Sequence, residues 1–339
     1  MLGRSTRQHT SPSLRKCLDI GPKLPIVTPN PPFRTPEKTL TTCQHSNPNA
    51  PYRNCTLRKW LRKWDVERVV IEPTGRFHRR VHQSLFDSGF EIILVNPLRS
   101  RRFAEAKGEL AKTDRVDAAM LAAYGTAFPG LDISEPKTEF FERFEAMMIS
   151  RESLVDYHTS LRQTAVELGG EEEERLKTIA GSIKAEIGKL EESIETHLRS
   201  DPDIAARYEI LLSIPGIGSV NAASLCCFMP ELGSIGHRQA ASLLGVAPFS
   251  RDSGKAKGQR KIRGGRSRPR DALYMAAQSA YRWNPDMAAV YDRLSANGKE
   301  HKIVIVAIMR KLIILANVLL RDGREWAKQA PASTIVARG

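Results

Sequence analysis

Three acidic side chains in the first half of the chain could share a metal ion. Asp114 and Asp117 lie three residues apart in "LAKTDRVDAAML", and on a helix this spacing places both carboxylates on one face. Glu72 ends the apolar segment "VERVVIEP", which predicts a buried strand stopped by Pro73. Strand ends line the crevice of an open α/β sheet, so the three acids could converge there, and clustered carboxylates suit Mg²⁺. For the aspartate pair alone, two solvated acids at a helix start explain the spacing equally well.

A basic segment in the second half is suited to binding phosphate groups. "PFSRDSGKAKGQRKIRGGRSRPR" (248–270) holds nine Lys or Arg residues against one Asp. It predicts a flexible, nucleic-acid-binding loop. Its expected contact residues are Arg251, Lys255, Lys257, Arg260, Lys261 and Arg263. On composition alone, a serine within such a loop would not be expected to react.

A glycine-containing turn precedes this basic segment. In "IPGIGSVNAASL" (214–225), Gly216 and Gly218 lead into a helix, as in the hairpin of a helix-hairpin-helix motif. Glycines there let the backbone approach a phosphate, and the helix N-terminus supplies N–H donors. An ordinary turn between two helices is the alternative.

Composition restricts the class of partner and the compartment. The chain has 339 residues and a formal net charge of +14, which favours polyanionic partners, nucleic acid above all. Its five cysteines form no C-x-x-C pair, which argues against a disulfide framework or a structural zinc site and fits a reducing cytoplasm. No signal peptide is visible. The apolar segment 303–320 carries Arg310 and Lys311 at its centre, so it is expected to be a buried helix and not a membrane span.

Other motifs give weaker signals. His78 and His82 in "HRRVH" lack the glutamate of a zinc protease motif, so a packing or surface role is expected. The four tryptophans are dispersed along the chain and are expected to lie in the core and not to stack on bases. They are Trp60, Trp64, Trp283 and Trp326.

The pattern of elements predicts several structural regions. Two strands alternate with helices between residues 55 and 125, with Thr113 or Asp114 as the N-cap of the helix that bears the aspartates. Residues 136–200 predict a helical hairpin or a coiled coil with an acidic outer face, and so a dimer or tetramer. The expected boundaries are a Pro-rich irregular segment (1–54), an α/β domain (55–130), a helical arm (131–203), a mainly α-helical DNA-binding domain (204–328) and a tail (329–339).

The segments "VVIEPTG" and "VNPLRSRRFAEAKGELAKTDRVDAAML" resemble the catalytic core of the DEDD transposases of bacterial insertion sequences. The resemblance covers about residues 55–125, and a second block covers about 205–325. It implies an RNase H-like (RuvC-like) α/β domain, a long helical arm and a mainly α C-terminal domain. It also implies a DNA recombinase of the cytoplasm and the bacterial nucleoid, without a membrane, guided by a structured RNA.

The resemblance assigns roles to individual residues. Glu72, Asp114 and Asp117 match acids that hold Mg²⁺, and Asp19 in "CLDIG" is the candidate for the fourth acid. Ser253 matches a nucleophilic serine that attacks a DNA phosphodiester in a site shared between subunits; Ser250 is the less favoured neighbour. Arg251, Lys255 and Lys257 would then stabilise the serine oxygen and the phosphate.

The N-terminal segment departs from the family pattern. After Asp19 the family continues through three antiparallel strands, whereas this chain has "PKLPIVTPNPPFRTPEK", whose prolines cannot occupy central strands. This pattern predicts a disordered arm and an incomplete sheet. Two alternatives to an active recombinase therefore stay open. One is a metal-dependent, structure-selective nuclease in which the serine has no role, and the other is an inactive relative that still binds nucleic acid.

Overall fold

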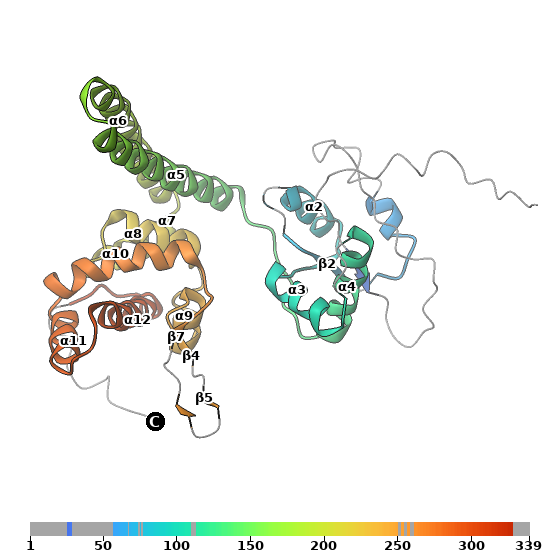
Figure 1. Ribbon diagram of the computed structural model, residues 1–339. Coiled ribbons are helices and arrows are strands. Elements are labelled where there is room, and N and C mark those ends of the chain that lie inside the picture. Colours follow the sequence, from blue (N-terminus) through green and yellow to red (C-terminus); the bar gives the residue numbers. More distant parts are fainter. Residues whose placement is uncertain are drawn as a thin grey trace, which may run out of the picture. The chain divides into compact units, whose positions relative to one another are not determined.

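The protein divides into two compact units, Met1–Lys137 and Thr138–Gly339 (Figure 1). The computed structural model describes most of the chain from residue 57 to residue 327. The described residues are 26–28, 57–66, 68–73, 75, 77–109, 113–249, 252–253, 256–257 and 261–327.

The described residues of the first unit are built on a mixed three-stranded sheet. Its strands are β1 (Ile26–Thr28), β2 (Arg68–Ile71) and β3 (Glu91–Leu94), in the order β1-β2-β3. β2 and β3 pair in parallel with Val70 opposite Ile93, and the helix α2 (Phe77–Phe86) connects them. The predicted strand–helix–strand arrangement with a partly parallel sheet is therefore confirmed.

Apolar side chains cover both faces of this sheet. On one face Val70 and Ile93 pack with Ala118, Leu121 and Tyr124 from α4 (Asp114–Ala127). On the other face Val69, Ile71 and Ile92 pack with Leu57, Leu61 and Leu85. A strand buried on both faces has a continuous apolar sequence, which is why "VERVVIEP" is apolar without alternation.

The expectation that the Pro-rich segment is only a disordered arm is wrong for residues 26–28. These residues form β1, which pairs antiparallel with β2 through Val27 and Val69. Pro25 and Pro29 flank the strand and do not interrupt it, and β1 lies at the edge of the sheet. Proline is tolerated next to a short edge strand, because it cannot donate to a central ladder.

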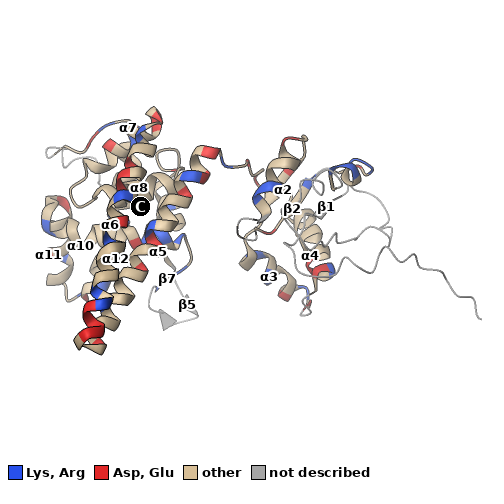
Figure 2. Cartoon of the chain, turned by 90° about the horizontal axis from the view of Figure 1, so that it is seen from above, with Lys and Arg blue, Asp and Glu red and all other residues tan. Residues whose placement is uncertain are grey.

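Two helices of thirty residues each open the second unit. α5 (Glu139–Leu168) and α6 (Gly170–Arg199) form a helical hairpin that turns at Gly169 and Gly170, both with positive φ. Arg151 joins the two helices through an ion pair with Glu191. Acidic residues begin α6 at Glu171–Glu174, and they pair with Arg175 and Lys177 along the same helix (Figure 2).

In the described part of the second unit, six further helices surround one large core. They are α7 (Pro202–Leu212), α8 (Ser219–Phe228), α9 (His237–Leu244), α10 (Ser267–Trp283), α11 (Pro285–Ala296) and α12 (His301–Asp322). α12 alone among the described helices is long and apolar enough to cross a membrane, but half of its most apolar stretch is buried in this core. Arg310 stays exposed on its outer side. The expected buried helix is therefore confirmed.

Candidate active site and nucleic-acid interface

Glu72 lies directly after β2 and is held by a serine of the neighbouring helix. Ser100 belongs to α3 (Pro97–Ala106), is buried, and donates from Oγ to Oε2 of Glu72 at 2.7 Å. The same hydroxyl lies 3.0 Å from the carbonyl oxygen of Pro97. Asn96 caps α3 by accepting from the N–H of Leu98. Ser100 of α3 thus holds Glu72 in a defined position at the C-terminal end of the central strand β2.

Asp114 and Asp117 lie in the first turn of α4. Thr113 is the N-cap, and its Oγ1 accepts from the N–H of Val116 at 3.3 Å, so the first of the two expected caps is confirmed. Both aspartates are half-buried. Carboxylates in a first helical turn are favoured by the unsatisfied N–H groups of the helix end.

The direction of α4 places its first turn toward the C-terminal end of β2, where Glu72 lies. Arg68 begins β2 and donates from Nη1 to the carbonyl oxygen of Pro129, which follows the end of α4, at 2.6 Å. Ala118 packs against Val70 in the middle of β2. α4 therefore runs antiparallel to β2, and its N-terminal aspartates lie toward the end of the strand that Glu72 follows.

A complete metal site is not assembled by the described residues. Among them, no group of three or more His, Cys, Asp or Glu side chains is placed to hold a metal ion. Asp19 lies outside the described residues. The chemistry of Glu72, Asp114 and Asp117 fits a hard cation, which prefers carboxylate oxygens. The expected convergence of these three acids into one metal-binding group is not observed among the described residues, and their roles as ligands stay predictions.

Ser253 lies at the tip of a β-hairpin. β4 (Pro248–Phe249) pairs with β7 (Lys261–Ile262), and β5 (Asp252–Ser253) pairs with β6 (Ala256–Lys257), both antiparallel. Ser253 faces Ala256 across the ladder, so only residues 254 and 255 separate the paired strands. The sequence predicts a flexible loop here, whereas these described residues form ladders.

The basic residues of the hairpin are described only in part. Lys261 and Arg263 are exposed, as a phosphate contact requires. Ser250, Arg251, Lys255 and Arg260 lie outside the described residues, and so do the side chains of Ser253 and Lys257. Their roles stay predictions.

Gly216 has a packing role in the turn between α7 and α8. Its φ is +101°, and a Cβ at this position would lie 2.5 Å from Cα of Ala280 in α10. Glycine is therefore required for close contact between two parts of the core, independently of any phosphate. Gly218, the N-cap of α8, is exposed, and a Cβ there would meet open space.

An acidic cavity lies beside the N-terminus of α8. It has a volume of about 290 Å³ and is lined by Ser219 together with Arg151 and the three glutamates Glu191, Glu192 and Glu195. Carboxylates at this position oppose the binding of a phosphate, because like charges repel. The phosphate contact at Gly216 and Gly218 stays a prediction, and the charge of this cavity argues against it.

Aromatic and histidine residues differ partly from expectation. Trp60 and Trp326 pack against the cores, as expected. The expectation is wrong for Trp283, which is 71% exposed at the end of α10, and for Trp64, which is 45% exposed. His82 is buried and bonds through Nε2 to the carbonyl oxygen of Ser134 at 2.6 Å, which is the expected packing role.

The sequence analysis missed Ser100 as a site residue. The signal for it is weak, since a serine in the basic segment "PLRSRRF" resembles any exposed helical serine. Only the packing of α3 beside β2 directs its hydroxyl to Glu72.

Comparison with known proteins identifies the class. Residues 35–166 match the DEDD domain model of IS110-type elements, described as a transposase, and residues 208–292 match the model described as the transposase IS116/IS110/IS902 family. The first match covers most of the first unit and continues into α5 of the second unit, the second match lies within the second unit, and together they span well over half of the chain. An acid-bearing domain followed by this second domain defines a DNA transposase.

The chain belongs to the IS110 family of transposases, and it is a DNA transposase or recombinase enzyme. It is 25% identical over 303 residues to the pilin gene-inverting protein of Moraxella bovis, covering 86% of this chain and 92% of that protein. The protein of the same name from Moraxella lacunata is 26% identical over 269 residues, 77% of this chain and 82% of the relative. An uncharacterised 42 kDa protein of insertion element IS900 from Mycobacterium paratuberculosis is 30% identical over 172 residues, 48% of this chain and 40% of that protein.

Family membership also supports parts of the expected fold and chemistry. The DEDD transposase domain implies an RNase H-like fold for the first unit, a dependence on divalent metal ions, and DNA as the substrate.

Proposed function

We propose that the protein exchanges DNA strands between two sites of an insertion element, with Ser253 as the nucleophile and Mg²⁺ held by Asp19, Glu72, Asp114 and Asp117. The observation that carries this proposal is the position of Ser253 at the last pair of the β5–β6 ladder, where it faces Ala256. A residue at a hairpin tip can reach into the active site of another domain or another copy of the chain. Two relatives are named as gene-inverting proteins, and inversion is a strand exchange of the same type.

In the proposed chemistry, each broken phosphoester bond of the DNA is replaced by a new phosphoester bond, so that the strands can be rejoined without an added energy source. The hydroxyl of Ser253 loses its proton and its oxygen attacks a DNA phosphorus, while the bond from phosphorus to a deoxyribose oxygen breaks and that oxygen takes up a proton. The product is a phosphoserine linkage, and a hydroxyl from a second strand reverses the step and releases the serine. Bound Mg²⁺ supplies positive charge that stabilises the phosphate oxygens.

Each group of residues has its own part in this reaction. The ion would be held at the C-terminal end of β2. Its ligands there would be Glu72, which Ser100 keeps in place, and the two aspartates of α4. Arg251, Lys255 and Lys257 would neutralise the phosphate beside Ser253, and Arg260, Lys261 and Arg263 would hold the flanking backbone.

The assembly that we propose contains more than one copy of the chain and a guide RNA. A dimer or tetramer allows the acids of one copy to meet the hairpin of another, and a formal net charge of +14 suits a protein that holds RNA and DNA together. Its place of action would be the cytoplasm, at the bacterial nucleoid.

Recombination in cells tests this proposal directly. The element's flanking noncoding DNA is supplied with the wild type, Asp114→Ala or Ser253→Ala, and junctions are counted by sequencing. Both variants are expected to lower junction counts at least a hundredfold. Persistent DNA cutting by Ser253→Ala would favour the structure-selective nuclease. An inactive wild type that binds DNA but no Mg²⁺ would favour the defective relative.

A further inference from the structure

The two ends of the serine-bearing hairpin cross in direct backbone contact. Gly245 ends α9 with φ +82°, and Gly264 and Gly265 precede α10, each with φ +75°. A methyl group on Gly245 would collide with the carbonyl oxygen of Gly264, and one on Gly265 would collide with the backbone of Gly245. Only glycine allows both the left-handed conformation and this close approach.

Hydrogen bonds fix both ends of the hairpin at the crossing. The N–H groups of Val246 and Ala247 donate to the carbonyl oxygen of Ala241 in α9. On the returning side, the N–H of Arg266 donates to the carbonyl oxygen of Leu243 at 2.8 Å. Nη1 of Arg270 donates to the carbonyl oxygen of Gly264 at 2.5 Å. The outgoing and returning segments are thus tied to the same helix end.

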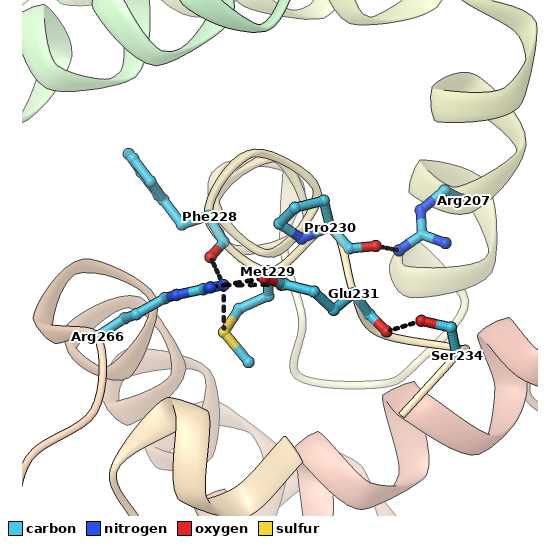
Figure 3. A network of polar contacts seen from close by, with 7 residues as sticks. All are labelled: Arg207, Phe228, Met229, Pro230, Glu231, Ser234 and Arg266. Carbon is cyan, nitrogen blue, oxygen red and sulfur yellow. Dashed lines mark hydrogen bonds and ion pairs between the residues drawn. The ribbon is translucent and has the colours of Figure 1, made fainter. Parts of the chain in front are cut away.

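The side chain of Arg266 anchors the crossing to the core (Figure 3). Its guanidinium forms a two-point ion pair with Glu231, with Nη2 to Oε1 at 2.6 Å and Nη1 to Oε2 at 2.8 Å. Nη1 also donates to the carbonyl oxygen of Phe228 at 2.7 Å. Such a planar two-point contact defines an orientation as well as a distance.

The segment that receives Arg266 is itself fixed on its other sides. Nη2 of Arg207 donates to the carbonyl oxygens of Pro230 and Leu232 at 3.1 and 2.9 Å. The fully buried Asn317 of α12 accepts from the N–H of Gly233 and donates to the carbonyl oxygen of Ile235. Hydrogen bonds therefore connect the base of the hairpin to the core of the second unit, and this connection sets the direction of the hairpin.

We propose that Gly245, Gly264, Gly265, Arg266 and Glu231 form a clasp that aims the hairpin and so positions Ser253 for attack. This inference rests on the proposed function, in which Ser253 is the nucleophile. Ser253 lies eight residues beyond Gly245, about 27 Å of extended chain at most. At that reach a tilt of about 2° at the clasp moves the tip by about 1 Å, and a misplacement of this size can lower a rate about a hundredfold.

Two variants and two matched controls test the clasp. Gly265→Ala introduces the backbone collision, and its control Gly298→Ala has a similar φ of +69° in open space. Glu231→Gln weakens the ion pair while keeping the shape. Its control Glu209→Gln affects the pair that Glu209 forms with Arg199 at 2.6 Å on α7 and α6.

The measurements separate positioning from stability and from binding. They are the single-turnover rate of covalent protein–DNA complex formation at saturating DNA, the DNA Kd, the Tm, and hydrogen exchange of peptides from residues 245–266. Both clasp variants are expected to lower the rate at least tenfold and to increase exchange in these peptides, with Kd within twofold. Glu231→Gln should keep the Tm close to that of the wild type, whereas Gly265→Ala should lower it, because its Cβ collides with the backbone of Gly245. The two controls are expected to leave the rate and the exchange unchanged.

Two results would overturn the clasp. One is a rate within twofold of the wild type in both clasp variants. The other is a loss of rate in Glu231→Gln that only follows a loss of Tm or DNA affinity, because that pattern shows a structural role. Ser253→Ala in the same assay keeps the two proposals apart. A covalent complex formed by Ser253→Ala overturns the proposed nucleophile, whereas an inactive Ser253→Ala beside fully active clasp variants overturns the clasp alone.

Discussion

At the scale of single residues, Ser100 shows how a carboxylate at the C-terminal end of β2 can be oriented before a cation binds. The hydroxyl of Ser100 donates a hydrogen bond to one carboxylate oxygen of Glu72. Partners of this kind orient a ligand before the ion arrives, and removing one costs affinity although it never touches the metal.

Ser100→Ala is therefore expected to raise the Mg²⁺ concentration for half-maximal DNA cleavage about tenfold. A metal titration of the cleavage rate measures the change. Ser88→Ala is the matched control, since Ser88 follows the end of α2 and its hydroxyl donates to the carbonyl oxygen of Ser84 in the last turn of that helix. Equal titration curves for Ser100→Ala and Ser88→Ala would rule out a role of Glu72 as a metal ligand oriented by Ser100.

Cys226 illustrates a residue whose chemistry is suppressed by burial. Cys226 and Cys227 are free and buried in α8, and Cys17, Cys43 and Cys55 lie outside the described residues. Burial raises the pKa of the Cys226 thiol to about 12, and Arg207 opposes this shift only partly. A thiol of this kind is inert as a nucleophile at neutral pH.

The raised pKa of Cys226 predicts a pH dependence of stability. The unfolded state releases the thiol proton near its ordinary pKa of 9.0, while the folded state keeps it until about pH 12. The free energy of unfolding should therefore fall as the pH rises above 9, by up to about 1.4 kcal/mol per pH unit from this group. Urea unfolding at pH 8 to 11 measures the slope, and Cys226→Ala should have a shallower one. Identical slopes would contradict the buried thiol.

At the scale of elements, close contacts between helices explain residues that look functional in the sequence. The turn between α7 and α8 packs on α10, where Asn284 donates to the carbonyl oxygen of Pro215 and Gly216 meets Ala280. The two glycines of this turn thus differ in their surroundings: Gly216 is enclosed by α10, whereas Gly218 faces open space.

Gly216→Ala and Gly218→Ala should differ strongly in stability. At Gly216 the collision and the positive φ together are expected to lower the free energy of unfolding by about 2–4 kcal/mol. Gly218 has an ordinary φ of −86° and free space, so about 1 kcal/mol or less is expected from the poorer cap. Denaturant unfolding compares the two. If Gly218→Ala also leaves DNA affinity unchanged, the predicted phosphate contact at this turn is wrong.

Local patterns predicted the elements around the acids well. Apolar runs, Pro73 and Thr113 fixed β2, β3 and the start of α4 because periodicity and capping are properties of neighbouring residues. The pairing of β1 was missed because three residues between prolines carry little signal. The crossing of Gly245 with Gly265 and the contact of Ser100 with Glu72 depend on residues 20 or more positions apart, and a single sequence gives no direct record of such contacts.

At the scale of the whole molecule, the two units have separate cores. The large cluster of the second unit draws its described members from residues 140–326, and the two clusters of the first unit draw theirs from residues 57–131. A division of this kind suits an enzyme in which one domain binds the metal and another presents the nucleophile.

The second unit is therefore expected to fold when residues 138–339 are produced alone. Urea unfolding should give one cooperative transition, because the core is complete within the fragment. Leu312→Ala should lower the free energy of unfolding by about 2–5 kcal/mol in both the fragment and the full chain, and Ile303→Ala, which is 54% exposed, by less than about 1 kcal/mol. A fragment without a cooperative transition would contradict the independence of this core.

Mass spectrometry of the covalent protein–DNA complex tests the central claim most directly. The purified protein is incubated with its flanking DNA, the noncoding RNA and Mg²⁺, then denatured, and the DNA-linked peptide is identified. We expect one phosphoserine-linked peptide with the nucleotide on Ser253, absent from Ser253→Ala and from Asp117→Asn. A linked nucleotide on another residue, or strand exchange that proceeds in Ser253→Ala, would contradict the account.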